Sequence, residues 1–131
     1  MMAPMRILIV DDHELIRRGL RHILDERPNW EICGEAVNGQ EAIRLAAEFR
    51  PDVIVMDIAM PIMNGLEATE HLNRNGCKAK IVILTMFDIQ NMVARARQIG
   101  AHGYVAKSEA ALRLIDTIEE VLGGANETFR R

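Results

Sequence analysis

Four short, largely apolar segments of this chain are each followed by a polar residue that can take part in chemistry. The segments cover residues 6–10, 53–56, 80–84 and 103–106, and the residues that follow them are Asp11 with Asp12, Asp57, Thr85 and Lys107. Continuous apolar runs of this length are typical of strands buried on both faces of a parallel sheet. Because the carboxyl ends of parallel strands line one crevice, we expect these five side chains to converge at one edge of the sheet.

Between these segments, apolar residues recur at the three- and four-residue spacing of amphipathic helices. In the second helix Asn38 is the predicted N-cap and Glu41 can reach back to its backbone. Asp88 is the predicted N-cap of the fourth helix, which Gly100 is predicted to end. With a further strand over 31–37, the pattern predicts five alternating strands and helices, an α/β fold with a doubly wound parallel sheet.

The last helix carries more apolar residues than one core contact needs. The last helix is predicted to start at Ser108 and to end at Gly123-Gly124, and the first helix is predicted to end near Arg27. Leu114 and Val121 fall outside the predicted buried stripe of the last helix, so we expect a modest homodimer surface there. The alternative is that this wide face packs on the first helix. The predicted buried stripes are Leu15, Ile16, Gly19, Leu20, Ile23 and Leu24 in the first helix, and Leu112, Ile115, Ile118 and Leu122 in the last.

Composition fits one ordinary domain. With 131 residues, 49% hydrophobic residues and a net charge of -3, the chain can bury a single core. We expect one domain over 1–131 with its core at 6–124, and a tail or the start of a linker at 125–131. No basic run favours nucleic acid, no segment is long and apolar enough for a membrane, and Cys33 and Cys77 lack metal or disulfide spacing. A cytoplasmic location with reduced thiols is expected.

Three carboxylates, a hydroxyl and an ammonium at one sheet edge suit phosphoryl chemistry. Clustered carboxylates repel one another and attract a hard divalent cation, and Mg²⁺ typically takes one or two carboxylates together with waters and phosphate oxygens. Asp11, Asp12 and Asp57 are therefore the candidate Mg²⁺ ligands. Each residue alone has an ordinary structural role as a helix cap, strand former or surface charge. Their joint occurrence at four strand ends favours function.

The histidines are predicted to have surface or capping roles. His13, His22, His71 and His102 share no spacing of the kind that places two ligands on one helix face, and each lies in a different segment.

Four motifs occur in order along the chain: Val-Asp-Asp-His at 10–13, Met-Asp-Ile-Ala-Met-Pro-Ile-Met-Asn-Gly at 56–65, Ile-Leu-Thr-Met at 83–86 and Gly-Ala-His-Gly-Tyr-Val-Ala-Lys at 100–107. Together they resemble the receiver domain of bacterial two-component response regulators, over about residues 6–124. The segments 11–20 and 84–88 are similar to the NarL/LuxR-type subfamily, whose members usually carry a C-terminal helix-turn-helix DNA-binding domain. The resemblance implies a flavodoxin-like sheet in the order 2-1-3-4-5.

The resemblance also assigns roles to the strand-end residues. It implies that Asp57 is the phosphoacceptor, which attacks a phosphohistidine of a sensor histidine kinase, and that the Ala59 carbonyl completes a Mg²⁺ shell with the three acids. Lys107 and Thr85 would each hold a phosphoryl oxygen. The chain would be a signalling protein and not an enzyme, apart from autocatalytic phosphotransfer to Asp57 and slow self-dephosphorylation.

Four residues are expected to govern the response. Thr85 and Tyr104 are the candidate switch, although Tyr104 is equally consistent with a half-buried structural aromatic. Ala59 and Phe87 occupy the positions that in fast-dephosphorylating receivers carry polar, water-placing side chains, so the phosphorylated state is expected to be long-lived. Many receivers have a cis-proline after the lysine, and this chain has Ser108 there, which leaves the geometry of the Lys107-Ser108 bond open.

Other functions are weighed against this one. A haloacid-dehalogenase-type phosphatase would show an Asp-x-Asp pattern after the first strand, and a flavodoxin-like electron carrier would show a loop rich in Ser, Thr and Gly there; this chain has Asp-Asp-His-Glu-Leu. A stand-alone regulator that acts by protein contacts remains the alternative to control of an attached transcription factor, whose DNA-binding domain is absent from these 131 residues. The signal, the cognate kinase and the genes controlled are not encoded in any of these motifs.

Overall fold

The chain folds as one five-stranded parallel sheet between two layers of helices. The structure is a computed structural model and describes residues 3–86 and 90–123. The strands lie in the order β2-β1-β3-β4-β5, and each neighbouring pair is parallel, which confirms the predicted doubly wound fold. The strands are β1 (Met5–Val10), β2 (Trp30–Ala36), β3 (Val53–Asp57), β4 (Lys80–Thr85) and β5 (Gly103–Ala106).

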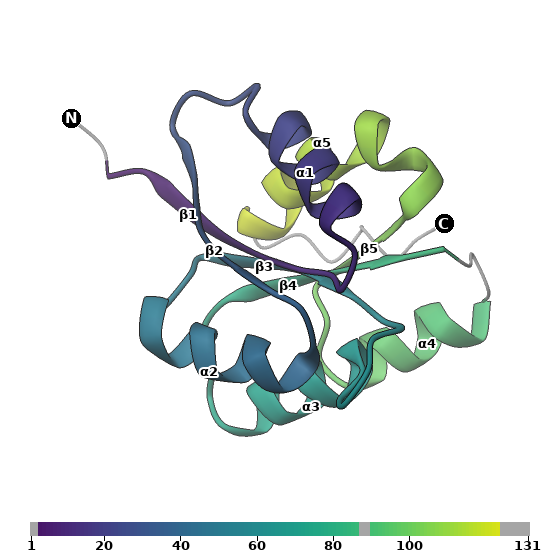
Figure 1. The fold of residues 1–131 in the computed structure, drawn as a ribbon. Helices are drawn as coiled ribbons and strands as arrows, with labels where there is room; N and C mark the ends of the chain where they lie inside the picture. The colour runs from purple at the N-terminus through teal and green to yellow at the C-terminus, as the bar shows by residue number, and fades with distance from the viewer. Residues whose placement is uncertain (1–2, 87–89, 124–131) are drawn as a thin grey trace.

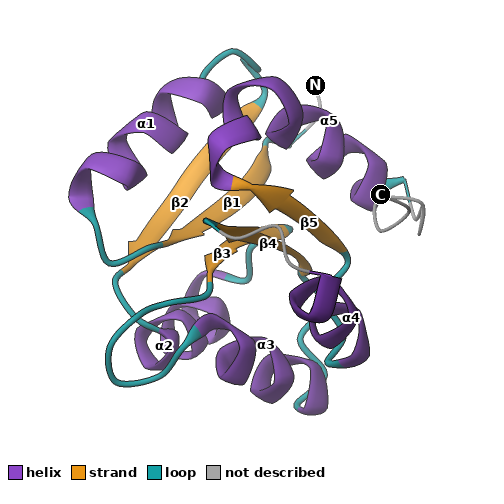
Figure 2. Ribbon diagram, turned by 90° about the vertical axis from the view of Figure 1, so that its right-hand side faces the viewer, coloured by secondary structure: helices purple, strands orange, loops and turns teal. Residues whose placement is uncertain are grey.

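Helices cover both faces of the sheet. Two of them, α1 and α5, lie on one face, and α2, α3 and α4 lie on the other (Figures 1 and 2). Their bounds are α1 (Glu14–Leu24), α2 (Gly39–Phe49), α3 (Gly65–Arg74), α4 (Gln90–Gln98) and α5 (Ala110–Leu122), with a short 3-10 helix η1 (Lys107–Glu109) ahead of α5. None of the helices in the described ranges is long and apolar enough to span a membrane.

The sheet separates two apolar cores. Side chains alternate along each strand, so neighbouring strand residues contribute to opposite cores. In β3, Ile54 and Met56 pack with α2 and α3, whereas Val53 and Val55 pack with α1 and α5. All five residues of β3 are buried. A strand with no exposed face gives the residue at its end a fixed position.

Strand register brings the predicted site residues to one edge. Val10 pairs with Met56, so Asp11 and Asp57 come next on adjacent strands. Thr85 pairs with Ala106, so Lys107 follows directly beyond that pair.

Several predicted helix ends are confirmed. Glu41 N donates to Asn38 Oδ1 at 2.8 Å, although the Glu41 carboxylate accepts from Val37 N and not from Asn38. Gly100 adopts a φ of +101°, the left-handed conformation that suits a helix C-terminus. The predicted cap Asp88 lies outside the described residues.

The predicted start of the last helix is wrong. Ser108 lies within η1, and α5 begins only at Ala110, after Glu109, which forms no side-chain capping hydrogen bond. The described residues contain no cis peptide bond, so the Lys107-Ser108 bond is trans.

The predicted inward stripe of α5 is confirmed for Ile115 and Ile118 and wrong for Leu112 and Leu122. Leu114, Ile118 and Val121 are buried, whereas Leu112 is 83% exposed and Leu122 is 40% exposed. The reason is the close approach of α5 to β5 at Gly103, where a Cβ atom would lie 2.9 Å from Thr117 Cγ2. The helix face that carries the small side chains Ala110 and Thr117 allows this approach, and it turns Leu114 and Val121 inward. The surplus apolar residues of α5 are therefore Leu112 and Leu122.

The first helix also differs from its prediction. It ends at Leu24, with Asp25 as C-cap, and not near Arg27. Leu20 and Leu24 are buried as predicted, but Leu15 and Ile16 are exposed. These two residues lie in the first turn, next to the carboxyl edge of the sheet, where no strand remains for them to cover.

Candidate phosphoacceptor site

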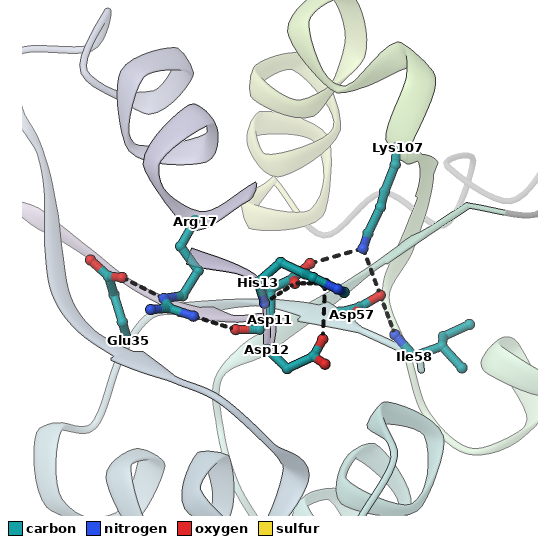
Figure 3. A network of polar contacts seen from close by, with 8 residues as sticks. All are labelled: Asp11, Asp12, His13, Arg17, Glu35, Asp57, Ile58 and Lys107. Atoms are coloured by element: carbon teal, nitrogen blue, oxygen red, sulfur yellow. Dashed lines mark hydrogen bonds and ion pairs between the residues drawn. The ribbon is translucent and has the colours of Figure 1, made fainter. Parts of the chain in front are cut away.

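Asp11, Asp57 and Lys107 form a buried charge cluster at the carboxyl edge of the sheet. Lys107 Nζ lies 2.9 Å from Asp11 Oδ2 and 3.1 Å from Asp57 Oδ1, so one ammonium bridges two carboxylates (Figure 3). Asp11 and Asp57 are buried, and Lys107 reaches them from η1, directly after β5. The structure thus confirms that residues nearly a hundred positions apart meet at the predicted edge.

The loop after β3 fixes the position of Asp57 through backbone hydrogen bonds and close packing. Ile58 N donates to Asp57 Oδ1 at 2.9 Å, and Gly65 N donates to Ile58 O at 2.8 Å, which folds the loop back so that α3 begins beside the end of β3. A Cβ atom at Gly65 would lie 1.8 Å from the Asp57 carbonyl oxygen. Only glycine fits at this point, so the glycine of the 56–65 motif is required by packing.

The electrostatics of the cluster favour an added positive charge. Burial, and then the Asp11 carboxylate, raise the pKa of Asp57 above its ordinary value, although Lys107 and the Ile58 N–H act in the opposite direction. Burial alone would lower the pKa of Lys107, but hydrogen bonds and charge from Asp11 and Asp57 raise it. Lys107 is therefore protonated at neutral pH, and a single cation serves two buried acids.

His13 joins this cluster, which the sequence reasoning did not predict. Its Nδ1 lies 3.3 Å from Asp11 Oδ1 and 3.2 Å from Asp12 Oδ1, and its backbone N–H donates to Asp11 Oδ1 at 2.9 Å. The sequence signal for this contact is the direct adjacency of His13 to two acids, and not any spacing between histidines. His102 has a structural role instead, since Ile81 N donates to its Nδ1 at 3.0 Å.

The acidic residues can hold a divalent cation. Side-chain donor atoms of Asp11, Asp12 and His13 all lie within 4.8 Å of one another, while Asp57, the third predicted ligand, is not part of this group. Asp11 Oδ2 and Asp12 Oδ1 are buried, and among the described residues they contact Lys107 Nζ at 2.9 Å and His13 Nδ1 at 3.2 Å, respectively. Oxygen atoms of this kind are the ligands that Mg²⁺ prefers, so the donor set fits a hard divalent cation.

A second charged network supports the backbone of Asp11. Arg17 donates through Nη1 to the Asp11 carbonyl oxygen at 2.8 Å and through Nε to Glu35 Oε1 at 2.8 Å (Figure 3). Arg21 contacts the other Glu35 oxygen. Burial alone would raise the pKa of Glu35, but the two arginines lower it below its ordinary value. No sequence spacing signals this network, because it depends on β2 lying beside β1.

The other predicted residues include Thr85 of β4 and Tyr104 of β5. Thr85 is buried at the end of β4, on the same edge. Tyr104 is half-buried in β5, pairs with Ile83 and packs against the core that α2, α3 and α4 cover. Ala59 is exposed in the loop after β3. Phe87 lies outside the described residues.

Comparison with known proteins agrees with this architecture. The model of the response regulator receiver domain family matches residues 7–119. The transcriptional regulatory protein LiaR of Bacillus subtilis is 40% identical over 119 residues, which are 91% of this chain and 56% of LiaR. The chain thus spans little more than half the length of that relative.

Solved structures give the same result. A two-component response regulator of the LuxR family from Aurantimonas has a TM-score of 0.89 at 38% identity, with 94% of this chain and 88% of that chain covered. The receiver domain of a NarL-type regulator from Mycobacterium tuberculosis has a TM-score of 0.84 at 26% identity, with 94% and 97% covered. The fold, the buried acid cluster and these matches together show that the chain belongs to the response regulator receiver domain family, with its relatives among regulators of the NarL/LuxR type.

Proposed function

We propose that this protein is a phosphorylation-dependent signalling switch in which a sensor histidine kinase transfers a phosphoryl group to Asp57 with the help of Mg²⁺. The observation that carries the proposal is the Asp57 carboxylate itself. It is buried at the end of the sheet's central strand, and one cation, Lys107, lies 3.1 Å from its Oδ1. A carboxylate in this setting is positioned as a nucleophile, since phosphoryl transfer needs mainly positioning and positive charge.

The contacts of Asp57 suggest different roles for its two carboxylate oxygens. Oδ1 accepts from Ile58 N at 2.9 Å and faces Lys107, so we assign it the role of holding the carboxylate in place. Oδ2 then supplies the electron pair that forms the new O–P bond, while the N–P bond of the phosphohistidine breaks and the electron pair returns to the imidazole. Lys107 and the Thr85 hydroxyl would stabilise the negative oxygens of the transferred group.

A bound Mg²⁺ would add positive charge at the same edge. When bound by Asp11, Asp12 and the Ala59 carbonyl, with Asp57 as a further ligand, Mg²⁺ would neutralise charge on the phosphoryl oxygens. His13 lies against the same two acids, at 3.2 to 3.3 Å, and so must either move aside for the ion or contribute to its ligand shell.

Thr85 and Tyr104 would change conformation in response to phosphorylation. Thr85 would move toward the phosphoryl group, and Tyr104, one strand away in β5, would occupy the space that this movement releases. A Tyr104→Ala protein should still be phosphorylated. If its partner binding or self-association then responded to phosphorylation as in the wild type, the switch role of Tyr104 would be lost.

The proposed regulatory output of this receiver is based on its similarity to transcriptional regulators. LiaR is described as a transcriptional regulatory protein and is nearly twice the length matched here. We therefore propose that this receiver acts in the cytoplasm and controls a DNA-binding domain, residues 125–131 being the start of the linker.

Homodimerisation through α5 is also proposed, now with the exposed Leu112 in place of the buried Leu114 and Val121. A monomer at high concentration, with and without beryllofluoride, in sedimentation experiments would refute the dimer.

The test of the main proposal is phosphoryl uptake. Incubation with acetyl phosphate and Mg²⁺ should add the mass of one phosphoryl group, and removal of Mg²⁺ by a chelator should prevent it. The Asp57→Asn protein should gain no mass. Equal uptake by Asp57→Asn would show that another residue is the acceptor.

A further inference from the structure

The edge of the sheet opposite the phosphoacceptor site carries a cleft with no role in the function proposed above. It lies between the C-terminal ends of α2 and α3, beside the loops that lead into β3 and β4, and has a volume of about 810 Å³. This volume falls within the range of small-molecule sites, which is roughly 300 to 1,000 Å³. The cleft is lined mainly by apolar groups, among them Ile43, Ala46, Pro51 and Leu72.

Positive charge surrounds this apolar cleft. Arg50, Lys78 and Lys80 all line it, and none of the three forms an ion pair within residues 3–86 and 90–123. Asp52 is the one acid in the lining, and its Oδ2 already accepts from Arg6 N at 2.8 Å. The cleft therefore offers an apolar interior together with a surplus of cations that have no carboxylate partner.

We propose that this cleft binds an amphipathic organic anion, specifically a free medium-chain fatty acid. The apolar lining would take the alkyl chain, and Arg50, Lys78 and Lys80 would hold the carboxylate. A highly charged ligand such as a nucleotide fits less well, because the lining is mostly apolar. The proposal is independent of phosphorylation at Asp57, since the two sites lie at opposite edges of the sheet.

Cys77 provides a reporter inside the cleft. It is one of only two cysteines, and it lines the cleft, whereas Cys33 lies on β2 with its Sγ 3.4 Å from the Ile7 carbonyl oxygen. Decanoate below its micellar concentration should slow the alkylation of Cys77 by iodoacetamide, measured by peptide mass spectrometry, and leave Cys33 unaffected. Unchanged alkylation of Cys77 at saturating decanoate, or equal protection of both cysteines, would overturn the proposal.

Substitutions distinguish the contribution of the lysine charges to binding from that of the apolar lining. In a displacement assay with the anionic dye anilinonaphthalene sulfonate, Lys78→Gln and Lys80→Gln should each weaken decanoate binding by about threefold. Arg18→Gln, which removes an exposed cation of α1, should leave it unchanged. Ala47→Phe should abolish binding by filling the cleft from an exposed position of α2.

Three results would refute the assignment. If decanol, which lacks the charge, bound as tightly as decanoate, the cations would have no part in recognition. If the lysine variants bound like the wild type, these side chains would serve only to offset the helix C-termini. If the protein co-sedimented with phosphatidylglycerol vesicles but did not bind soluble decanoate, the surface would be a membrane contact and not a site for a free fatty acid.

Discussion

Replacing Arg17 by Met tests whether the network behind the acid cluster supports both stability and metal binding. Arg17 is 15% exposed and Glu35 is 28% exposed, so their contact is largely shielded from solvent. The substitution keeps the apolar stem of the side chain but leaves the buried Asp11 carbonyl without its 2.8 Å donor. An unsatisfied buried acceptor costs about 1 to 3 kcal/mol, and loss of the charged contact with Glu35 adds about 1 kcal/mol.

We therefore expect the free energy of unfolding at neutral pH to fall by about 2 to 4 kcal/mol. The deficit should depend on pH, because the folded-state pKa of Glu35 is lowered. The stabilisation from Glu35 is fully present above its unfolded pKa near 4.5, and it is lost as the pH falls through the folded value. The difference between wild type and variant should therefore shrink below pH 4.5.

Urea unfolding followed by the fluorescence of Trp30, the single tryptophan, measures these differences. The matched control is Arg18→Met on the same helix, whose contact with Glu14 is 3.8 Å long and exposed; it should change stability by less than about 0.5 kcal/mol. Because Arg17 also fixes the Asp11 peptide, its variant should bind Mg²⁺ several-fold more weakly. A deficit no larger than that of the control, or one that is constant across pH, would refute the reasoning.

Three other predictions concern stability and the lifetime of the phosphorylated state. Gly65→Ala should cost about 3 kcal/mol or prevent folding, whereas Gly19→Ala, an exposed helical position with nothing within 4 Å of the new Cβ, should be neutral or gain up to about 1 kcal/mol in thermal denaturation. The folded-state pKa of Lys107 is raised, so the stabilisation that its charged form gives to the fold is fully present below the ordinary pKa of 10.5 and is lost as the pH rises through the folded-state pKa. A Lys107→Met protein should therefore match the stability of the wild type more closely in alkaline than in neutral urea titrations. Phosphoryl loss should be slow in the wild type and about tenfold faster in Ala59→Asn/Phe87→Glu, since one water-placing group is worth about 1 to 2 kcal/mol, and equal decay rates would remove these positions from control of the lifetime.

The sequence alone predicted the sheet and the acid cluster because both follow from one rule. Buried parallel strands appear as continuous apolar runs, and their carboxyl ends must meet at one edge. This rule brings Asp11, Asp57 and Lys107 together without any knowledge of side-chain packing. The cap at Asn38 and the helix end at Gly100 were predictable because each depends on residues close together in the chain.

The features that the sequence did not predict depend on contacts between elements. In α5 two apolar stripes satisfy helical spacing equally well, and the close packing against Gly103 of β5 decides between them. The contact between Arg17 and Glu35 requires β2 to lie next to β1, which strand order alone determines. His13 is the exposed N-cap residue of α1, in agreement with its predicted surface or capping role, but its contacts with the two acids before it do not depend on spacing between histidines and were not predicted.

The most direct test of phosphorylation at Asp57 is to identify the phosphorylated residue by chemical trapping. After phosphorylation with acetyl phosphate and Mg²⁺, borohydride reduces an aspartyl phosphate to homoserine, and peptide mass spectrometry then locates the reduced residue. The account predicts homoserine at position 57 alone, at the buried end of β3. Homoserine at Asp11 or Asp12, or no reduced residue in a protein that has taken up the phosphoryl group, would contradict it.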